Sequence, residues 1–379
     1  ASARRLLARF GGPEQIFAAP RAAWEACITA RQASHLGQLP EQFAQRCSAA
    51  WAWLHNAPAG VGRDIITLAD PRYPPSLLQI EDPPLLLYVQ GHPGVLAHRG
   101  GPLVQMAQCL AIVGSGHPTA QGSSNAHAFA HNLVQQGWTV VSGLAAGIDA
   151  AAHAGALAAV PHGTTALATI AVVGTGLDQI YPRQHQALAQ GIAQHGLILS
   201  EFPLGTPPLA ANFPKRNRII AGLSCGTLVV EAALASGSLI TARLASEQGR
   251  EVFAIPGSIH APQAKGCHAL IRQGAKLVET AQDILEELTS LPRTQALAHT
   301  AALPLVPPVP AAPSLAVARC TAEQASLLEA LGFDPVGLDA LAARTGWSAA
   351  LLQAQLLELE LEGLVASLPG GLFQRMAQS

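Results

Sequence analysis

The segment Phe213-Pro214-Lys215-Arg216-Asn217-Arg218-Ile219-Ile220-Ala221-Gly222 decides how this chain is interpreted. It places three of the 22 basic residues of a 379-residue chain within four positions. They lie at the start of a predicted helix that leads into an apolar strand at 227–230. Because only 12% of all residues are charged, such a cluster indicates a positioned anion site, or else a solvated helix end.

Apolar runs alternate with helical patterns on both sides of this segment. The runs lie at 110–113, 139–141, 169–173, 197–199, 227–230 and 252–255, followed by a shorter one at 276–278. Helical patterns separate them at 120–136, 148–159, 183–195, 213–222 and 238–248. Uninterrupted apolar strands that alternate with helices are typical of a parallel sheet covered on both faces. Right-handed crossovers then predict an α/β fold with a Rossmann-like, doubly wound, mostly parallel sheet.

The remaining sequence divides into smaller parts. Short helical patterns with turn signals predict a small N-terminal helical domain at 1–57. The extended Rossmann-like domain covers 58–288, and a strand at 85–89 is expected to join an edge of its sheet. Six prolines within 289–318 predict a semi-extended linker.

The C-terminal part, 319–379, has its own pattern. Three helical segments, at 322–331, 338–345 and 348–362, precede a two-stranded element with its turn at Pro369-Gly370-Gly371. Three helices closed by a hairpin predict a winged helix.

Charge is unevenly distributed along the chain. The net charge is −2, but residues 321–379 hold seven acidic and two basic residues, a net of −5, so the rest carries +3. A polyanion site therefore belongs to the first part and must be local.

Several classes of protein are disfavoured by composition. The longest apolar stretch, near 166–177, is too short and too interrupted for a membrane span, and no secretion signal opens the sequence. The six cysteines form no CxxC pair and the 14 histidines form no HExxH pattern. We therefore expect a cytoplasmic protein with reduced thiols, no metal, no cofactor and no membrane partner.

Glycine-rich turns follow the predicted strands. They are Gly114-Ser115-Gly116, the run from Gly143 to Gly147, Gly174-Thr175-Gly176 and Ser236-Gly237-Ser238. Glycine lets a phosphate approach the backbone, and the helix that follows offers free N–H groups. Carboxyl ends of parallel strands share one sheet edge, so these turns and the basic cluster predict phosphate binding there. The first turn is not GxGxxG and no P-loop is present, which counts against NAD, FAD and P-loop nucleotides.

Two motifs resemble those of enzymes. Gly222-Leu223-Ser224-Cys225-Gly226 matches GxSxG, but it runs from helix into strand, opposite to a nucleophile elbow. Gly226-Thr227 with Glu231 is similar to a turn of Rossmann-like nucleoside-phosphate hydrolases, whose double-glycine turn is missing here. We expect Glu231 to orient loop amides and the chain not to be an enzyme. The hydrolase remains the alternative, and a scaffold that serves only as an interaction module is a third possibility.

Taken together, the motifs resemble those of the DNA-processing protein A family (DprA, also called Smf). They are GSGHPTAQG, SGLAAGIDAAAH, TIAVVGTGLDQIYP, LSEFPLG, FPKRNRIIAGLS, GSLITARLASEQGREVFAIPGS and GCHALIRQGA, and the resemblance covers about 60–288. It implies a protein that binds and protects incoming single-stranded DNA, dimerises, and loads RecA recombinase during natural transformation. It also implies that 1–57 is an incomplete SAM- or helix-hairpin-helix-like unit.

The resemblance also implies which residues act. The expected DNA-binding residues are Ser115, Gly116, Gly143, Gly147, Phe213, Lys215, Arg216, Asn217, Arg218, Ser238 and Thr241. Within this set, Phe213 is expected to stack on a base, the three cations to hold phosphates, and Asn217 to fix the loop. The expected dimer contacts are His268, Ile271 and Leu277.

Three features set expectations specific to this chain. Gly116 and Ala146 stand where the family usually has basic residues, so binding should depend more on Lys215, Arg216 and Arg218. The segment 348–362, expected to be the recognition helix, carries three glutamates and no lysine or arginine. We therefore expect the winged helix to contact protein rather than DNA.

Overall fold

The computed structural model describes residues 2–98, 100–160, 167–290, 321–333 and 335–376. Its centre is a nine-stranded sheet in the order β1-β2-β6-β5-β4-β3-β7-β8-β9. The strands are β1 (Gly62–Thr67), β2 (Leu86–Gly91), β3 (Cys109–Val113), β4 (Thr139–Ser142), β5 (Thr169–Val172), β6 (Gly196–Ser200), β7 (Gly226–Val229), β8 (Glu251–Ala254) and β9 (Lys276–Leu277). From β6 to β9 all neighbours are parallel, while β1 and β2 add an antiparallel pair at one edge.

The sheet is doubly wound, as the sequence predicts. The chain runs from β3 through β4 to β5 and β6 in one direction, then returns to place β7 on the other side of β3. The helices that connect these strands are α8 (Ala120–Gln135), α9 (Ile148–Ala158), α10 (Gln186–His195), α11 (Asn212–Leu223), α12 (Ser238–Glu247) and α13 (Lys265–Arg272), and α14 (Ala281–Ser290) follows the last strand. The direction of winding reverses between β3 and β7, which makes the end of these two strands the expected ligand crevice.

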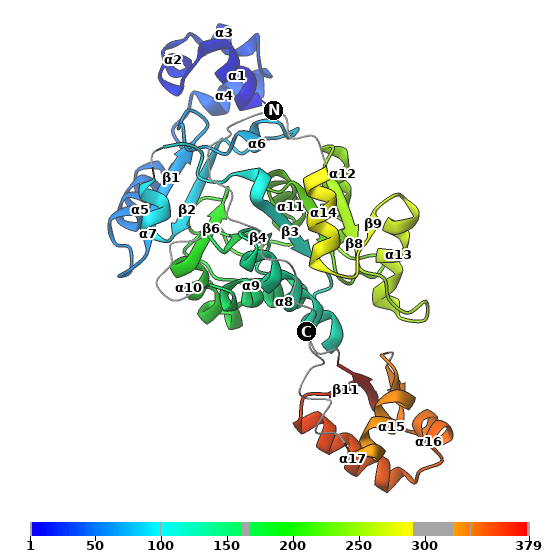
Figure 1. Cartoon of the computed structure of the whole chain (residues 1–379). Coiled ribbons are helices and arrows are strands. Elements are labelled where there is room, and N and C mark those ends of the chain that lie inside the picture. Colours follow the sequence, from blue (N-terminus) through cyan, green and yellow to red (C-terminus); the bar gives the residue numbers. More distant parts are fainter. Residues whose placement is uncertain (1, 99, 161–166, 291–320, 334, 377–379) are drawn as a thin grey trace.

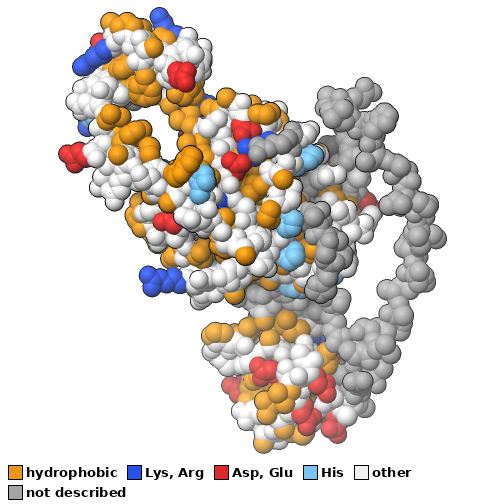
Figure 2. Space-filling view, turned by 90° about the vertical axis from the view of Figure 1, so that its left-hand side faces the viewer, with side chains coloured by type: hydrophobic (Ala, Val, Ile, Leu, Met, Phe, Trp, Pro, Cys, Tyr) orange, Lys and Arg blue, Asp and Glu red, His pale blue; other side chains and the backbone are white. Residues whose placement is uncertain are grey.

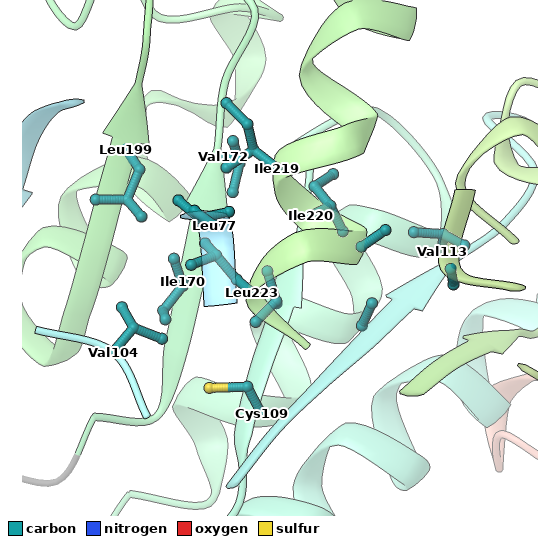
Figure 3. Packing of buried hydrophobic residues seen from close by; sticks show 14 of the residues in the cluster. Leu77, Val104, Cys109, Val113, Ile170, Val172, Leu199, Ile219, Ile220 and Leu223 are labelled. Carbon is teal, nitrogen blue, oxygen red and sulfur yellow. The ribbon is translucent and has the colours of Figure 1, made fainter. Parts of the chain in front are cut away.

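Helices cover the sheet on both faces (Figure 1). Successive residues of a strand point into one helix layer and then into the other. Leu110 and Ile112 point to the layer of α8, α9 and α14, whereas Ala111 and Val113 point to the layer of α11 and α12. In the second layer, Ile219, Ile220 and Leu223 of α11 lie over Ile170, Val172 and Leu199 of the strands, next to Leu77 of α6 (Pro75–Leu78) (Figure 3). Helix α11 is therefore fixed by a buried apolar face, and its polar face is left for the sheet edge.

The N-terminal segment has two parts. Helices α1 (Ser2–Phe10), α2 (Pro13–Ala18), α3 (Arg21–Glu25) and α4 (Ala30–Leu36) share one small core that contains Leu6, Ile16 and Trp24. Helix α5 (Phe43–His55) instead packs Trp53 into the core of the sheet domain, beside Ala171 and Ile198. A short helix, α7 (Pro93–Ala97), follows β2.

The C-terminal part has a core of its own. Helices α15 (Ala322–Leu331), α16 (Leu338–Thr345) and α17 (Ala349–Leu361) pack on a sheet of β10 (Val336–Gly337), β12 (Leu372–Arg375) and β11 (Val365–Leu368). The predicted winged helix is present, with the small strand β10 added. Acidic side chains gather on this C-terminal part, at the bottom of Figure 2, while charged side chains are sparse elsewhere on the visible face. The predicted linker lies almost wholly outside the described residues.

We expect Gly155→Ala to destabilise the fold by about 1–3 kcal/mol, since α8 and α9 approach each other there without side-chain space. A Cβ at Gly155 would lie 2.8 Å from Cα of His127, a backbone atom that cannot move alone. Gly191→Ala in α10 is the matched control, because its Cβ would meet only the tip of Leu157, at 3.2 Å. The control should change stability by at most about 1 kcal/mol, in the stabilising direction. Denaturant unfolding measures both, and equal effects would contradict the close packing.

Candidate nucleic-acid interface

A small cavity of about 200 Å³ opens at the carboxyl ends of β3 and β7. We call it the switch-point cavity. Its walls come from the turn after β3, the turn after β4, the start of α11 and the start of α12. Of the residues expected at the DNA site, it is lined by Gly116, Phe213, Arg216, Asn217, Ser238 and Thr241. The structure therefore brings together residues that lie more than 120 positions apart.

The other expected residues lie around this cavity or away from it. Ser115, Gly143 and Gly147 belong to the two turns whose neighbours Gly114, Ala145 and Ala146 line the wall. The turn at Gly174-Thr175-Gly176 does not line the cavity itself. Thr175 is 1% exposed, and its hydroxyl donates to the carbonyl of Gln179 at 2.8 Å. Gly174 lies behind the ring of Phe213.

Arg216 is buried, with 4% of its surface exposed, although it was expected to hold a phosphate at the surface. Its Nη1 donates to the carbonyls of Gly143 and Val172, which end β4 and β5. Burial lowers the pKa of this guanidinium, and the charge of nearby Asp149 counteracts that shift. Asp149 in turn accepts a hydrogen bond from the amide of Gly143 at 3.0 Å. Arg216 thus fixes the second turn from below while it borders the cavity.

Burial also shifts the pKa values of two ionisable groups near Arg216, namely Asp149 and His153. Desolvation raises the pKa of Asp149, and the charge of Arg216 opposes that shift. Desolvation, together with the positive charge of Arg216, lowers the pKa of His153 to about 3. His153 is therefore neutral at physiological pH, and its Nδ1 lies 2.7 Å from the hydroxyl of Thr169. The positive charge beneath the second turn is carried by Arg216 alone among these groups.

The other two cations of the cluster point elsewhere. Successive helix residues are rotated by about 100°, so Lys215 and Arg218 share one side of α11 and Arg216 faces the sheet. Arg218 forms a bidentate ion pair with Glu201, at 2.7 and 2.6 Å. Lys215 is exposed, and within the described residues its ammonium has no hydrogen-bond or ion-pair partner. The three cations were expected to act together, but Lys215 is exposed without a partner among the described residues, Arg216 is buried and Arg218 is ion-paired.

The glycines of the first two turns differ in whether a side chain could replace them. A Cβ at Gly143 would lie 2.5 Å from Cζ of Arg216. Gly147 has a φ of +80°, and its Cβ would meet Cδ of Pro118 at 2.7 Å. Gly116 is unconstrained, because its Cβ would meet nothing closer than the carbonyl of Ala146 at 3.9 Å and its φ is not positive.

Glu231 orients a loop, as the sequence analysis expects. Its carboxylate accepts from the amide and the hydroxyl of Thr119, at 2.9 and 2.6 Å. The same hydroxyl accepts from the amide of Gly122 and so caps α8. Asn217 likewise donates to the carbonyl of Gly237, at 3.3 Å, and joins α11 to the turn before α12. Both side chains hold the walls of the switch-point cavity in place.

The aromatic residue Phe213 is partly exposed and has a neighbour that the sequence analysis did not single out. The ring centroid of Tyr181 lies 5.5 Å from that of Phe213. Tyr181 belongs to the quoted motif TIAVVGTGLDQIYP, but its place next to α11 depends on how the loop after β5 folds back. Asp149 was missed for the same reason, since its role is set by a buried cation from a distant helix.

The expected dimer residues lie together near the β9 edge of the sheet. Leu277 is 51% exposed on β9. Ile271 on α13 is partly buried and packs on the main core. His268 places its Nε2 3.0 Å from the carbonyl of Gly257.

Two other findings concern the described residues as a whole. No three His, Cys, Asp or Glu side chains among them gather into a group that could hold a metal ion. None of their helices combines the length and apolar character that a membrane crossing requires.

We expect Arg216→Met to destabilise the protein by about 3–5 kcal/mol, because it leaves buried Asp149 without its compensating charge. Lys215→Met, one residue away and exposed, should change the free energy of unfolding by no more than about 0.5 kcal/mol. Denaturant titration of both variants tests this difference. Equal stability of the two would mean that the guanidinium of Arg216 is not buried.

Two parts of the chain match models of known protein families. Residues 64–289 match the family model of DNA recombination-mediator protein A, and residues 306–371 match the DprA winged helix domain. The chain is 40% identical over 350 residues to Protein Smf of Escherichia coli, which covers 91% of this chain and 84% of that protein.

Two solved structures are similar to it. DNA processing protein A of Streptococcus pneumoniae has a TM-score of 0.62 and 36% identity, covering 76% of this chain and 92% of that one. DNA processing protein A of Helicobacter pylori, described for its unique single-stranded DNA binding mode, has a TM-score of 0.51 and 30% identity, covering 60% and 96%. With more than half of its length matched by the family model, this chain belongs to the DNA recombination-mediator protein A (DprA) family.

Proposed function

We propose that this chain binds single-stranded DNA across the switch-point cavity, protects it, and loads RecA recombinase onto it during natural transformation. One observation carries the proposal: the turns after β3 and β4 and the starts of α11 and α12 converge on one cavity that Phe213 lines. The exposed Lys215 lies in the first turn of the same helix α11. Membership of a recombination-mediator family supports it, as does the single-stranded DNA binding described for the Helicobacter pylori relative. We place this activity in the cytoplasm.

The size of the cavity favours a polymer over a small molecule. At about 200 Å³ it is smaller than the roughly 300–1,000 Å³ of typical small-molecule sites. A strand can lie across its rim, with a base against Phe213 and phosphates near Lys215 and the loop amides. A duplex offers no free base to the ring.

A nucleoside-phosphate hydrolase is the alternative, and the position of Glu231 argues against it. Both carboxylate oxygens already accept hydrogen bonds from Thr119, so the group serves the loop. We therefore propose a binding protein that does not catalyse a reaction.

For the winged helix, whose α17 exposes Leu357 and Leu361 beside glutamates, we propose a protein-contact or regulatory role.

Two opposite substitutions test the DNA site. Lys215→Ala should weaken binding to oligo(dT) and lower the slope of log affinity against log salt by about 0.7, the value for one phosphate contact on a single strand. Gly116→Arg should tighten binding and steepen the slope by a similar amount, because the structure leaves room for its side chain. Gln15→Arg on α2 adds the same charge far from the site and should change neither quantity.

Titrations of oligo(dT) and of duplex DNA over a range of salt concentrations measure these effects. Unchanged slopes in both variants would mean that the DNA lies elsewhere. Base release from AMP-type substrates, abolished by Glu231→Gln, would favour the hydrolase instead.

We also propose a homodimer formed through β9 and α13. Leu277→Arg should give a folded monomer, because this side chain is exposed and its replacement disturbs no core. Leu39→Arg in the N-terminal part, where Leu39 is 78% exposed, is the matched control and should leave the dimer intact. Light scattering after gel filtration gives the mass. A wild-type monomer, or a Leu277→Arg dimer, would rule out this interface.

A further inference from the structure

Tyr181 extends the aromatic surface of the candidate site beyond Phe213. The two ring centroids are 5.5 Å apart, with an angle of 36° between the planes. Phe213 lines the switch-point cavity, whereas Tyr181 is 47% exposed outside it. Within the described residues the hydroxyl of Tyr181 makes no hydrogen bond, so this large ring is presented to solvent without a polar partner.

The loop that carries Tyr181 is held rigidly. The hydroxyl of Ser200 donates to the carbonyl of Thr175 at 2.6 Å, and the amide of Gly176 donates to the carbonyl of Thr206 at 3.0 Å. After Tyr181, the Nδ1 of His185 lies 3.0 Å from the carbonyl of Leu144, which belongs to the turn after β4. The ring is therefore pre-positioned, and a ligand that stacks on it need not order the loop first.

The geometry of the ring pair decides where a base could stack. A base held between two rings would need their planes about 7 Å apart, twice the contact distance between carbon atoms. The observed pair is too close and too tilted for that. A base can instead stack on the outer face of Tyr181, next to one that contacts Phe213. Arg183, two residues further in the short helix η2 (Arg183–His185), is exposed and can meet the phosphate between them.

We propose that Tyr181 is a second base-stacking residue, which holds the nucleotide next to the one on Phe213 as the strand leaves the switch-point cavity. This inference rests on the proposed binding of single-stranded DNA and specifies the path of the strand. Stacking on aromatic side chains tolerates any base, so Tyr181 adds affinity without sequence preference.

The test compares oligo(dT) with an abasic sugar–phosphate oligomer of the same length. Tyr181→Ala should weaken oligo(dT) binding by roughly 5- to 150-fold, the range for one lost stacking contact. Its affinity for the abasic oligomer and its salt slope should stay as in the wild type. Tyr181→Phe should retain oligo(dT) binding. Phe17→Ala, which removes another exposed aromatic ring from the N-terminal part, is the control and should have no effect.

A double variant separates direct stacking from support of the neighbouring ring. If Tyr181 and Phe213 hold different bases, the losses from Tyr181→Ala and Phe213→Ala should multiply in the double variant. A double variant no weaker than Phe213→Ala alone would overturn the proposal, because Tyr181 would then only support Phe213. Unchanged oligo(dT) binding by Tyr181→Ala would overturn it as well, while absence of wild-type binding would instead refute the proposed function.

Discussion

The buried guanidinium of Arg216 fixes α11 to the ends of two neighbouring strands. It comes from α11 and donates to carbonyls at the ends of β4 and β5, while Asp149 of α9 supplies the opposing charge. Those carbonyls lie where strands end, and a cation with several fixed donors suits them. The position of α11, and with it the cavity and the exposure of Lys215, depends on this contact.

A consequence is that positive charge at this site has two separate roles. The guanidinium of Arg216 holds the ends of β4 and β5 in place, and that of Arg218 is ion-paired with Glu201. Of the three cations, Lys215 is the one that is exposed without an ion-pair partner among the described residues. If DNA binds there as proposed, one free cation would hold its phosphates weakly, which fits release of the DNA to a partner.

Much of the fold could be predicted from the sequence, because the apolar strands are buried on both faces and their pattern is unambiguous. Strand β1 was not predicted, since Arg63 and Asp64 interrupt its apolar pattern and its pairing with β2 is an edge feature. The glycine-rich turns indicated one edge of the sheet, and the switch-point cavity lies at that edge. The directions of the three cations were not predicted, because they depend on where α11 begins and on acceptors supplied by distant loops.

The role of Glu231 could be anticipated, whereas Tyr181 and Asp149 could not. Glu231 follows a strand directly, so its position at the sheet edge is fixed by local sequence. Tyr181 reaches Phe213 only through a loop whose course is set by bonds to β6 and to the turn after β4. Residues that act through such long-range contacts leave no local pattern to detect.

The overlap between a side chain at position 143 and the guanidinium of Arg216 constrains how this protein can change over generations. Any residue larger than glycine at 143 requires a shorter one at 216, and a shorter residue at 216 leaves Asp149 without its counter-charge. Single replacements at either position are therefore expected to be harmful by themselves, and a tolerated change has to alter the pair together with the acid. Positions 143, 149 and 216 are therefore expected to change together, although the first and the last are 73 positions apart in the sequence.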